Sequence, residues 1–259
     1  MAEHVLVSKE DRVLRLTLNR PEKRNALTSA MCRALVDALE SARDDRHVGC
    51  VLLAAAGDAF SAGMDLDESI APDAAEKTEI HEALFTIGAR YSKPIVAAVK
   101  GPALGGGFGL LVNAHVAIAA HGGNFGVTEI RLGMWPFVIW RAVAAALGDR
   151  RALELALTGR IFGVHEALAW GLVHEAVPPF ELDDRATAVA ANLSMASPEA
   201  VKRGLEYFER TRHLSYEESG RLSRQLRAEL FAGADFHEGV AAFKEHRRPE
   251  WPSIPTAED

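Results

Sequence analysis

A run of glycines after an apolar segment is the first feature of the sequence that could do chemistry. Residues 95–99 are typical of a buried strand, and Gly105, Gly106 and Gly107 follow where a helix is expected to start. Glycines at a helix start expose backbone N–H groups, and the helix dipole adds partial positive charge there. Such donors suit an oxygen on which negative charge develops during a reaction. Close backbone packing is the alternative explanation of the run.

Two nucleotide-binding motifs do not fit this turn. A Rossmann fingerprint that starts at Gly105 or Gly107 would need its last glycine where Leu110 or Val112 stands. A P-loop would need a lysine where Gly107 stands. The register therefore disfavours a dinucleotide-dependent oxidoreductase and a P-loop nucleotidase.

A second turn of related character lies at residues 59–66, whose sequence is AFSAGMDL, directly after an apolar run at 48–54. Together with residues 93–107, it resembles the enoyl-CoA hydratase/isomerase (crotonase) family. The resemblance extends from residue 19 to about residue 177, with weaker matches near the end of the chain. The further matching segments are Asn19-Arg20-Pro21, Asn25-Ala26-Leu27, Phe125-Gly126, Glu129-Ile130, Leu132-Gly133, Leu157-Thr158-Gly159, Glu166-Ala167, Gly171-Leu172-Val173, Glu238-Gly239 and Phe243.

The resemblance implies an α/β fold, a crotonase-type spiral of ββα units with a C-terminal helical trimerisation region. Residues 1–191 are then expected to form the spiral core with the coenzyme A and acyl site. Residues 192–259 are expected to form the helical oligomerisation region of a homotrimer or hexamer.

The resemblance also implies a site and a substrate. The N–H groups of Met64 and Gly106 would form an oxyanion hole for a thioester oxygen, and Glu129 would be the acid/base. Coenzyme A would enter as part of the acyl-CoA substrate, with no tightly bound cofactor and no metal. The residues expected along it are Lys23, Arg24, Ala26, Ala62, Asp65 and Leu66, with Lys244, Arg247 and Arg248 as second candidates for its phosphates.

Only one of the two glutamates that hold water in hydratases of the family is present. Gly109 stands at the first position, Glu129 at the second, and a usual glycine-rich turn is replaced by residues 136–140 (PFVIW). One base suffices to move a double bond from the 3,4 to the 2,3 position, because it removes a proton at C2 and returns it at C4. The favoured reaction is therefore Δ3-to-Δ2 enoyl-CoA isomerisation through a thioester enolate.

Two alternatives stay open. Enoyl-CoA hydration would require a replacement acid, for which the candidates are Asp67, Glu68, Glu79 and Glu82. A non-catalytic acyl-CoA-binding protein would keep the fold and lose the chemistry. His115, Trp135, Phe137 and Trp140 are interpreted as structural residues, although the resemblance places some of the aromatic ones near the acyl pocket.

The elements that must position these residues follow from hydrophobic periodicity. Thr28 is expected to cap a helix whose apolar positions recur at helical spacing, and residues 75–91 indicate a more charged helix. Beyond Pro178 only helices are indicated, with the join to the C-terminal region at 192–197. Strands are predicted at 14–18, 48–54, 95–99, 116–120 and 172–177.

Composition further restricts the kind of partner and the cellular location that can be expected for the protein. The chain has 259 residues, a formal net charge of -7 and two cysteines, Cys32 and Cys50, expected to be buried thiols. The acidic balance gives no general attraction to nucleic acid or to an anionic membrane. Residues 101–123 carry no Asp, Glu, Lys or Arg, but their seven glycines favour buried loop, helix and strand over a membrane span. A cytoplasmic protein is expected, because residues 1–18 are typical of a strand and not of a signal peptide.

Overall fold

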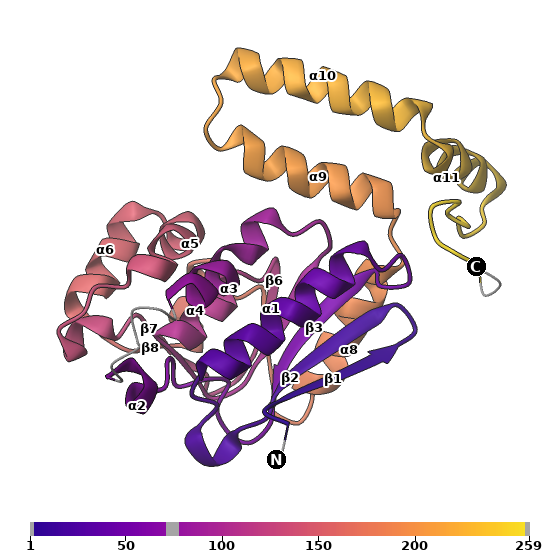
Figure 1. Ribbon diagram of the computed structural model, residues 1–259. Helices are drawn as coiled ribbons and strands as arrows, with labels where there is room; N and C mark the ends of the chain where they lie inside the picture. Colours follow the sequence, from indigo (N-terminus) through magenta and orange to yellow (C-terminus); the bar gives the residue numbers. More distant parts are fainter. Residues whose placement is uncertain (1–2, 71–77, 257–259) are drawn as a thin grey trace.

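A six-stranded, mainly parallel sheet forms the centre of the chain in the computed structural model, which describes residues 3–70 and 78–256 (Figure 1). The strand order is β1-β2-β3-β4-β6-β9, and only β1 runs antiparallel to its neighbour. Parallel strands end at the same edge, so the loops after β3 and β4 meet there. The strands are β1 Val5–Glu10, β2 Val13–Leu18, β3 Cys50–Ala55, β4 Ile95–Val99, β6 Val116–Ala120 and β9 Glu175–Val177.

Helices cover both faces of this sheet. Alternate residues of β3 point to opposite faces: Val51 and Leu53 join one core, and Cys50 and Leu52 join the other. The larger core is completed by α1 (Ser29–Asp44), α3 (Thr78–Arg90), α4 (Gly106–Val112) and α5 (Phe137–Leu147), and the smaller by α8 (Leu182–Ser194). Burial on both faces explains why these strands are apolar runs and do not alternate with polar residues.

A second, three-stranded sheet consists of β5 (Pro102–Leu104), β7 (Asn124–Gly126) and β8 (Phe162–Gly163). None of these strands was predicted from sequence, because two or three residues are too short to display a hydrophobic period. The sheet matters for the site, since β5 leads directly into α4 and β7 pairs with β5.

Most predicted elements are confirmed. The strands at 95–99 and 116–120 have the predicted bounds, and the Thr28 side chain accepts a hydrogen bond from Met31 N at the start of α1. The strand predicted at 172–177 is wrong in its first half, because Leu172 and Val173 donate to Ala167 O at the end of α7 (Val164–Ala169). Of the helix predicted at 75–91, residues 75–77 lie outside the described residues.

The uncharged segment at 101–123 contains β5, α4 and β6. Within residues 3–70 and 78–256, no helix is long and apolar enough to cross a membrane. Both cysteines are buried free thiols, and burial raises the pKa of each to about 12.

The C-terminal helices extend away from the sheet. Figure 1 shows α9 (Pro198–Thr211) and α10 (Tyr216–Ala232) side by side above the core. The next helix, α11 (Ala234–Glu245), lies beside the end of α10, on the side where α9 begins. The division predicted at residue 191 falls inside α8, which packs on the sheet as part of the core; the two-region division stays a prediction. The remaining helices of the described residues are η1 Pro21–Lys23, α2 Leu66–Ser69, η3 Glu129–Leu132 and α6 Asp149–Thr158.

Candidate active site

Two glycine-containing turns meet at the carboxyl edge of the sheet. Ser61 N donates to Pro102 O and Leu104 N donates to Ser61 O, both at 3.0 Å, which ties the turn after β3 to the turn after β4. Gly63 has φ +101°, and a Cβ there would lie 2.9 Å from Leu104 O and 3.3 Å from Gly106 N. Only glycine fits this conformation and this close approach. The contact brings the backbone of Gly63 against that of Gly106.

The two predicted oxyanion donors are available at this junction. Leu27 N donates to Gly63 O and Asp65 N donates to Leu27 O, so the bridge between these segments leaves the intervening Met64 N–H unused. Gly106 is the first residue of α4 and has no intrahelical acceptor. Within the described part of the chain, neither N–H donates to a backbone carbonyl. The sequence-based expectation of two donors from two turns is thus compatible with the geometry.

Glu129 lies beside this junction, at the start of η3. A Cβ on Gly105 would lie 3.5 Å from Glu129 Oε1, so the carboxyl group packs against the residue that precedes Gly106. Glu129 Oε2 is buried without a hydrogen-bond partner among the described residues. Burial raises the pKa of Glu129 above its ordinary value, against the smaller opposing effect of the Glu129 and Thr128 backbone amides. A buried carboxyl with an unused oxygen is suited to both accepting and returning a proton.

The position of the absent glutamate is filled. A Cβ on Gly109 would lie 2.4 Å from Ile139 Cγ2 and 2.9 Å from Phe85 Cδ1. Ile139 comes from the start of α5, where the usual glycine-rich turn is replaced, and Phe85 comes from α3. Apolar side chains therefore occupy the space in which a second carboxylate would lie.

The replacement acids considered from sequence do not reach into this space. Glu79 and Glu82 lie on the exposed face of α3, whereas Leu84 and Phe85 face the core. Asp67 is exposed on α2. Glu68 Oε2 accepts hydrogen bonds from Ser29 N and Ser29 Oγ at 2.8 Å, which fixes it at the start of α1.

Comparison with known proteins agrees with this architecture. The family model for enoyl-CoA hydratase/isomerase matches residues 8–253. The chain belongs to the enoyl-CoA hydratase/isomerase family. It is 35% identical to a hydroxycinnamoyl-CoA hydratase-lyase of Pseudomonas fluorescens, over 83% of this chain and 81% of that protein. It is 32% identical to a 2,3-dehydroadipyl-CoA hydratase of Escherichia coli, over 95% of this chain and 98% of that protein. A crystal structure of enoyl-CoA hydratase from Mycobacterium smegmatis superposes with a TM-score of 0.91 at 31% identity, over 96% of this chain and 99% of that one.

These likenesses confirm the family and the crotonase fold predicted from sequence. This enoyl-CoA hydratase/isomerase family member is an acyl-CoA enzyme. Its similarity to named hydratases supports an enzyme over a non-catalytic binding protein.

The predicted coenzyme A residues form a surface around η1 and the second turn. Ala62 N donates to Arg24 O at 2.9 Å, which holds the two segments together, and Lys23, Arg24 and Ala62 are exposed. Leu66 is exposed nearby in sequence, and Ala26 is half-buried. The role of these residues stays a prediction.

Asp65 differs from the other predicted binding residues. Its side chain is buried, accepts a 2.5 Å hydrogen bond from Arg20 and caps α2 through Asp67 N and Glu68 N. The bond from Arg20 is the largest cause of a lowered pKa at Asp65. Its side chain is engaged in holding the turn, so we expect Asp65 to position its neighbours.

We expect the Lys23→Ala, Arg24→Ala double variant to weaken acyl-CoA binding about fivefold at low salt, with the loss shrinking as salt rises. Both side chains are exposed, so screening limits their attraction to phosphate. Calorimetric titration with a non-reactive acyl-CoA at two salt concentrations measures this. The Arg33→Ala, Arg221→Ala variant removes the same charge from exposed positions elsewhere and serves as the control. Equal affinities of the two double variants would remove Lys23 and Arg24 from the site.

Other predicted residues have structural partners. His115 Nδ1 accepts from Ile95 N at 2.9 Å, and burial lowers the pKa of His115, as the structural interpretation requires. Arg247 is paired with Glu238 and Glu245, which leaves Lys244 and Arg248 as the second candidates that form no ion pair among the described residues.

Of the three aromatic residues interpreted as core, two pack on the core and one is exposed. Trp135 and Trp140 pack on the core with ring centroids 5.4 Å apart. Phe137 is 77% exposed, so its interpretation as a core residue is wrong. It is the first residue of α5 and points away from the face that carries Ile139.

Three residues that shape the site were missed from sequence. Phe85 and Ile139 fill the space beside Gly109. Asn25 is fully buried with φ +53°, and its amide donates to Ala56 O and Ala59 O, which fixes the second turn against η1. The Asn25-Ala26-Leu27 match was the signal that could have drawn attention to Asn25.

We expect Gly109→Ala to lower the free energy of unfolding by about 1–2 kcal/mol. Alanine gains up to about 1 kcal/mol in a helix, but overpacking costs about 1–3 kcal/mol, and the added Cβ meets Ile139 at 2.4 Å. Urea unfolding measures the change. Gly204→Ala in α9, whose Cβ would meet nothing within 4 Å, is the matched control and is expected to stabilise. Combining Gly109→Ala with Ile139→Ala should cost less than the two changes added; full additivity would contradict the described contact.

Proposed function

We propose that the chain catalyses Δ3-to-Δ2 enoyl-CoA isomerisation, with Glu129 as the single acid/base. The thioester oxygen would accept hydrogen bonds from the N–H groups of Met64 and Gly106. The Glu129 carboxylate would remove a proton from C2 to form the enolate, the double bond would shift to the 2,3 position, and the same carboxyl would return the proton at C4. No water is consumed, and substrate and product have the same mass.

The observation that carries this proposal is the filled space at Gly109. With Ile139 and Phe85 against that position, the carboxyl with an unused oxygen beside Gly105 is that of Glu129, whose Oε2 has no partner among the described residues. The buried carboxyl of the second turn, Asp65, is already engaged by Arg20 and by the start of α2. Hydration needs a positioned water in addition to a proton donor, and an apolar wall holds water poorly. A proton shuttle between two carbons needs one carboxyl with a raised pKa.

Incubation with 3-enoyl-CoA and, separately, 2-enoyl-CoA of several chain lengths tests the proposal. We expect the 3-enoyl ester to gain ultraviolet absorbance of the conjugated thioester without a change in mass. Absence of this conversion across chain lengths, in a preparation that binds acyl-CoA, would refute isomerisation.

Hydration is the second candidate, because two relatives that the chain matches over nearly their whole length carry the names of a hydratase and a dehydratase. In that reaction Glu129 would deliver the proton while water is held by groups other than a second carboxylate. A gain of one water by the 2-enoyl ester, lost in Glu129→Gln, would favour this candidate over isomerisation.

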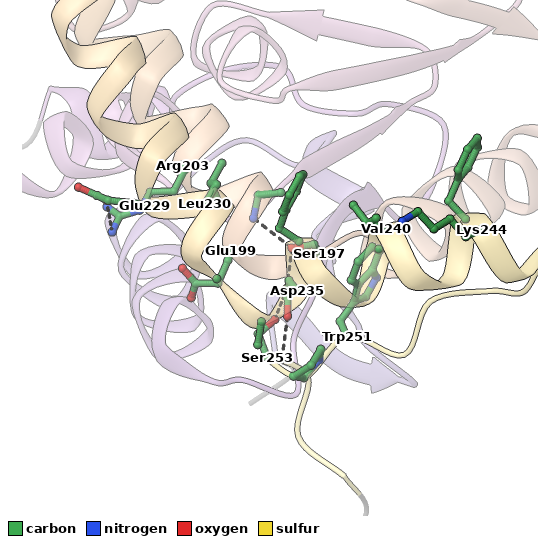
Figure 2. Close-up of a pocket in the computed structure, with 17 residues that line it drawn as sticks. Ser197, Glu199, Arg203, Glu229, Leu230, Asp235, Val240, Lys244, Trp251 and Ser253 are labelled. Carbon is green, nitrogen blue, oxygen red and sulfur yellow. Dashed lines mark hydrogen bonds and ion pairs between the residues drawn. The ribbon is translucent and has the colours of Figure 1, made fainter.

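We further propose that the C-terminal helices assemble the chain into a homotrimer or hexamer. A cavity of about 760 Å³ lies away from Glu129, between α9, α10 and α11 (Figure 2). It is lined by apolar side chains that include Val240 and Phe243, the latter 82% exposed. Beneath it Asp235 accepts hydrogen bonds from Ser197 and Ser253, which fix the groove wall. Light scattering measures the assembly; a monomer at micromolar concentration would contradict it.

A further inference from the structure

A second cavity lies at the opposite edge of the sheet from Glu129. It has a volume of about 390 Å³ and is bordered by residues that precede β2, β3 and β4, together with the start of α9. Five basic side chains line it against two acidic ones, Asp44 and Glu199, although the whole chain has a net charge of -7. The basic residues are Arg12, Arg43, Arg46, Lys93 and Lys202.

Neutral carbonyl groups hold three of these cations in place, since Arg46 NH2 also donates to Ser253 O at 3.3 Å. Arg12 Nε donates to Ser194 O at 3.2 Å and its NH1 donates to Arg46 O at 2.9 Å. Lys93 Nζ donates to Ala42 O and Asp45 O at 2.5 Å each. Carbonyl dipoles orient a cation but do not neutralise it.

Most of the positive charge is therefore uncompensated. Across the described residues, no carboxylate lies within ion-pair distance of Arg12, Arg46, Lys93 or Lys202. Arg43 pairs with Glu40 at 2.5 Å, yet its Nε is buried with no hydrogen-bond partner among the same residues. The cavity thus offers net positive charge and an unused buried donor.

Burial also disfavours the charged forms of two of these side chains, Arg12 and Lys93. Burial is the largest cause of a pKa of about 8 at Lys93, with Asp45 opposing the shift and the nearby Arg12 adding to it. Burial likewise lowers the pKa of Arg12, which Asp45 only partly offsets. An anion in the cavity would favour the charged forms of both side chains.

We propose that this cavity binds a small polyanion that carries phosphate groups. Its volume lies in the range of small-molecule sites, and guanidinium groups, three of which line it, are suited to phosphate oxygens through the N–H groups that their carbonyl and carboxylate contacts leave unused. The ligand would contact the core through Arg12 and Lys93 and contact α9 through Lys202, and so link the core to the C-terminal helices. This role is separate from the proposed isomerisation, because Glu129 lies at the other edge of the sheet.

Calorimetric titration of the full chain with pyrophosphate at low salt tests the proposal. We expect one pyrophosphate per chain and a rise in melting temperature, because a ligand that binds the folded state stabilises it. Arg46→Glu should weaken binding at least about tenfold, the scale of one lost charged hydrogen bond plus a reversed charge. Arg33→Glu is the matched control: it reverses an exposed arginine of α1 outside the cavity, and we expect affinity within about twofold of the parent chain.

Several outcomes would overturn the proposal. They are the absence of pyrophosphate binding at about 1 mM, equal weakening by Arg46→Glu and Arg33→Glu, and loss of binding in the Lys23→Ala, Arg24→Ala variant but not in Arg46→Glu. Citrate binding as tight as pyrophosphate would reject the assignment to phosphate. If Arg46→Glu does not fold, Lys202→Gln replaces it, because the Lys202 side chain lines the cavity and makes no hydrogen bond within the described residues.

Titration with coenzyme A then separates two sources of the phosphate. Two molecules per chain, reduced to one by Arg46→Glu, would mean that the phosphates of coenzyme A itself occupy the cavity. One molecule per chain together with pyrophosphate binding would mean that a separate phosphate compound does so. Either result supports the site.

Discussion

Glu129→Gln is expected to reduce kcat for 3-enoyl-CoA by about 10³-fold while leaving KM nearly unchanged. Acid/base catalysis by one positioned side chain contributes about 10²–10⁴-fold, and the side-chain atoms nearest to a Cβ on Gly105 belong to Glu129 and Thr128. Glutamine keeps the shape of the side chain but cannot carry the proton from C2 to C4. Steady-state kinetics with product identification measures the loss. Glu82→Gln, an exposed change on α3, is the control and should retain the parent rate.

The same substitution separates catalysis from folding. Burial raises the pKa of Glu129 in the folded chain, so the folded state binds its proton more tightly than the unfolded state does. The resulting stability is present below the unfolded pKa and is lost as pH rises through the folded one. At neutral pH the parent chain therefore bears the cost of a buried carboxylate. Glu129→Gln should unfold at no lower temperature, and unfolding of the variant would void the kinetic result.

The pH dependence of the parent enzyme follows from the same shift. The carboxylate form is the base that removes the C2 proton, so kcat/KM should fall as pH decreases through the raised pKa of Glu129. The acid limb of the profile is expected above the ordinary glutamate pKa of 4.5. A rate that stays constant down to pH 4.5 would exclude Glu129 as the base.

Much of the fold was predictable because it depends on local pattern. The β4 and β6 strands are continuous apolar runs, and Thr28 is a strong helix cap, so each signal lies within a few residues. The β8 strand has two residues and exists through its pairing with β7, which no local period can reveal. The prediction of a strand at 172–177 was wrong in its first half, because Leu172 N donates to Ala167 O at the end of α7.

The candidate site likewise has features that local sequence predicts and features that only tertiary contacts determine. The availability of the Gly106 N–H follows from its place at a helix start, which the sequence predicts. What fills the space at Gly109 depends on Ile139 and Phe85, which lie far from it in sequence and meet it through packing. Asp65 was predicted to bind ligand, yet its partner Arg20 comes from another segment and engages its side chain. Residue type and spacing therefore indicate the chemistry, whereas tertiary contacts decide which groups are available for it.

Gly106→Pro is expected to reduce kcat about 10²–10³-fold, whereas Gly106→Ala should cost much less. Proline removes the N–H that would stabilise the enolate oxygen, and loss of one such donor typically costs this much. Proline is tolerated at the first position of a helix, which Gly106 occupies in α4. Both substitutions add a Cβ that approaches Met64 Sδ and Phe85 Cζ at 3.2 Å, so alanine reports the steric cost alone.

The ratio of the kcat values of the alanine and proline variants, and not either kcat by itself, measures the contribution of the Gly106 N–H. Melting temperatures establish that both fold, and the affinity for a non-reactive acyl-CoA should change less than kcat, because the donor acts mainly on the charge of the transition state. Should the proline variant fail to fold, Met64→Pro against Met64→Leu removes the other donor with its own control. Equal rates of the proline and alanine variants would mean that the enolate oxygen is stabilised elsewhere, and the two turns would then be joined for packing alone.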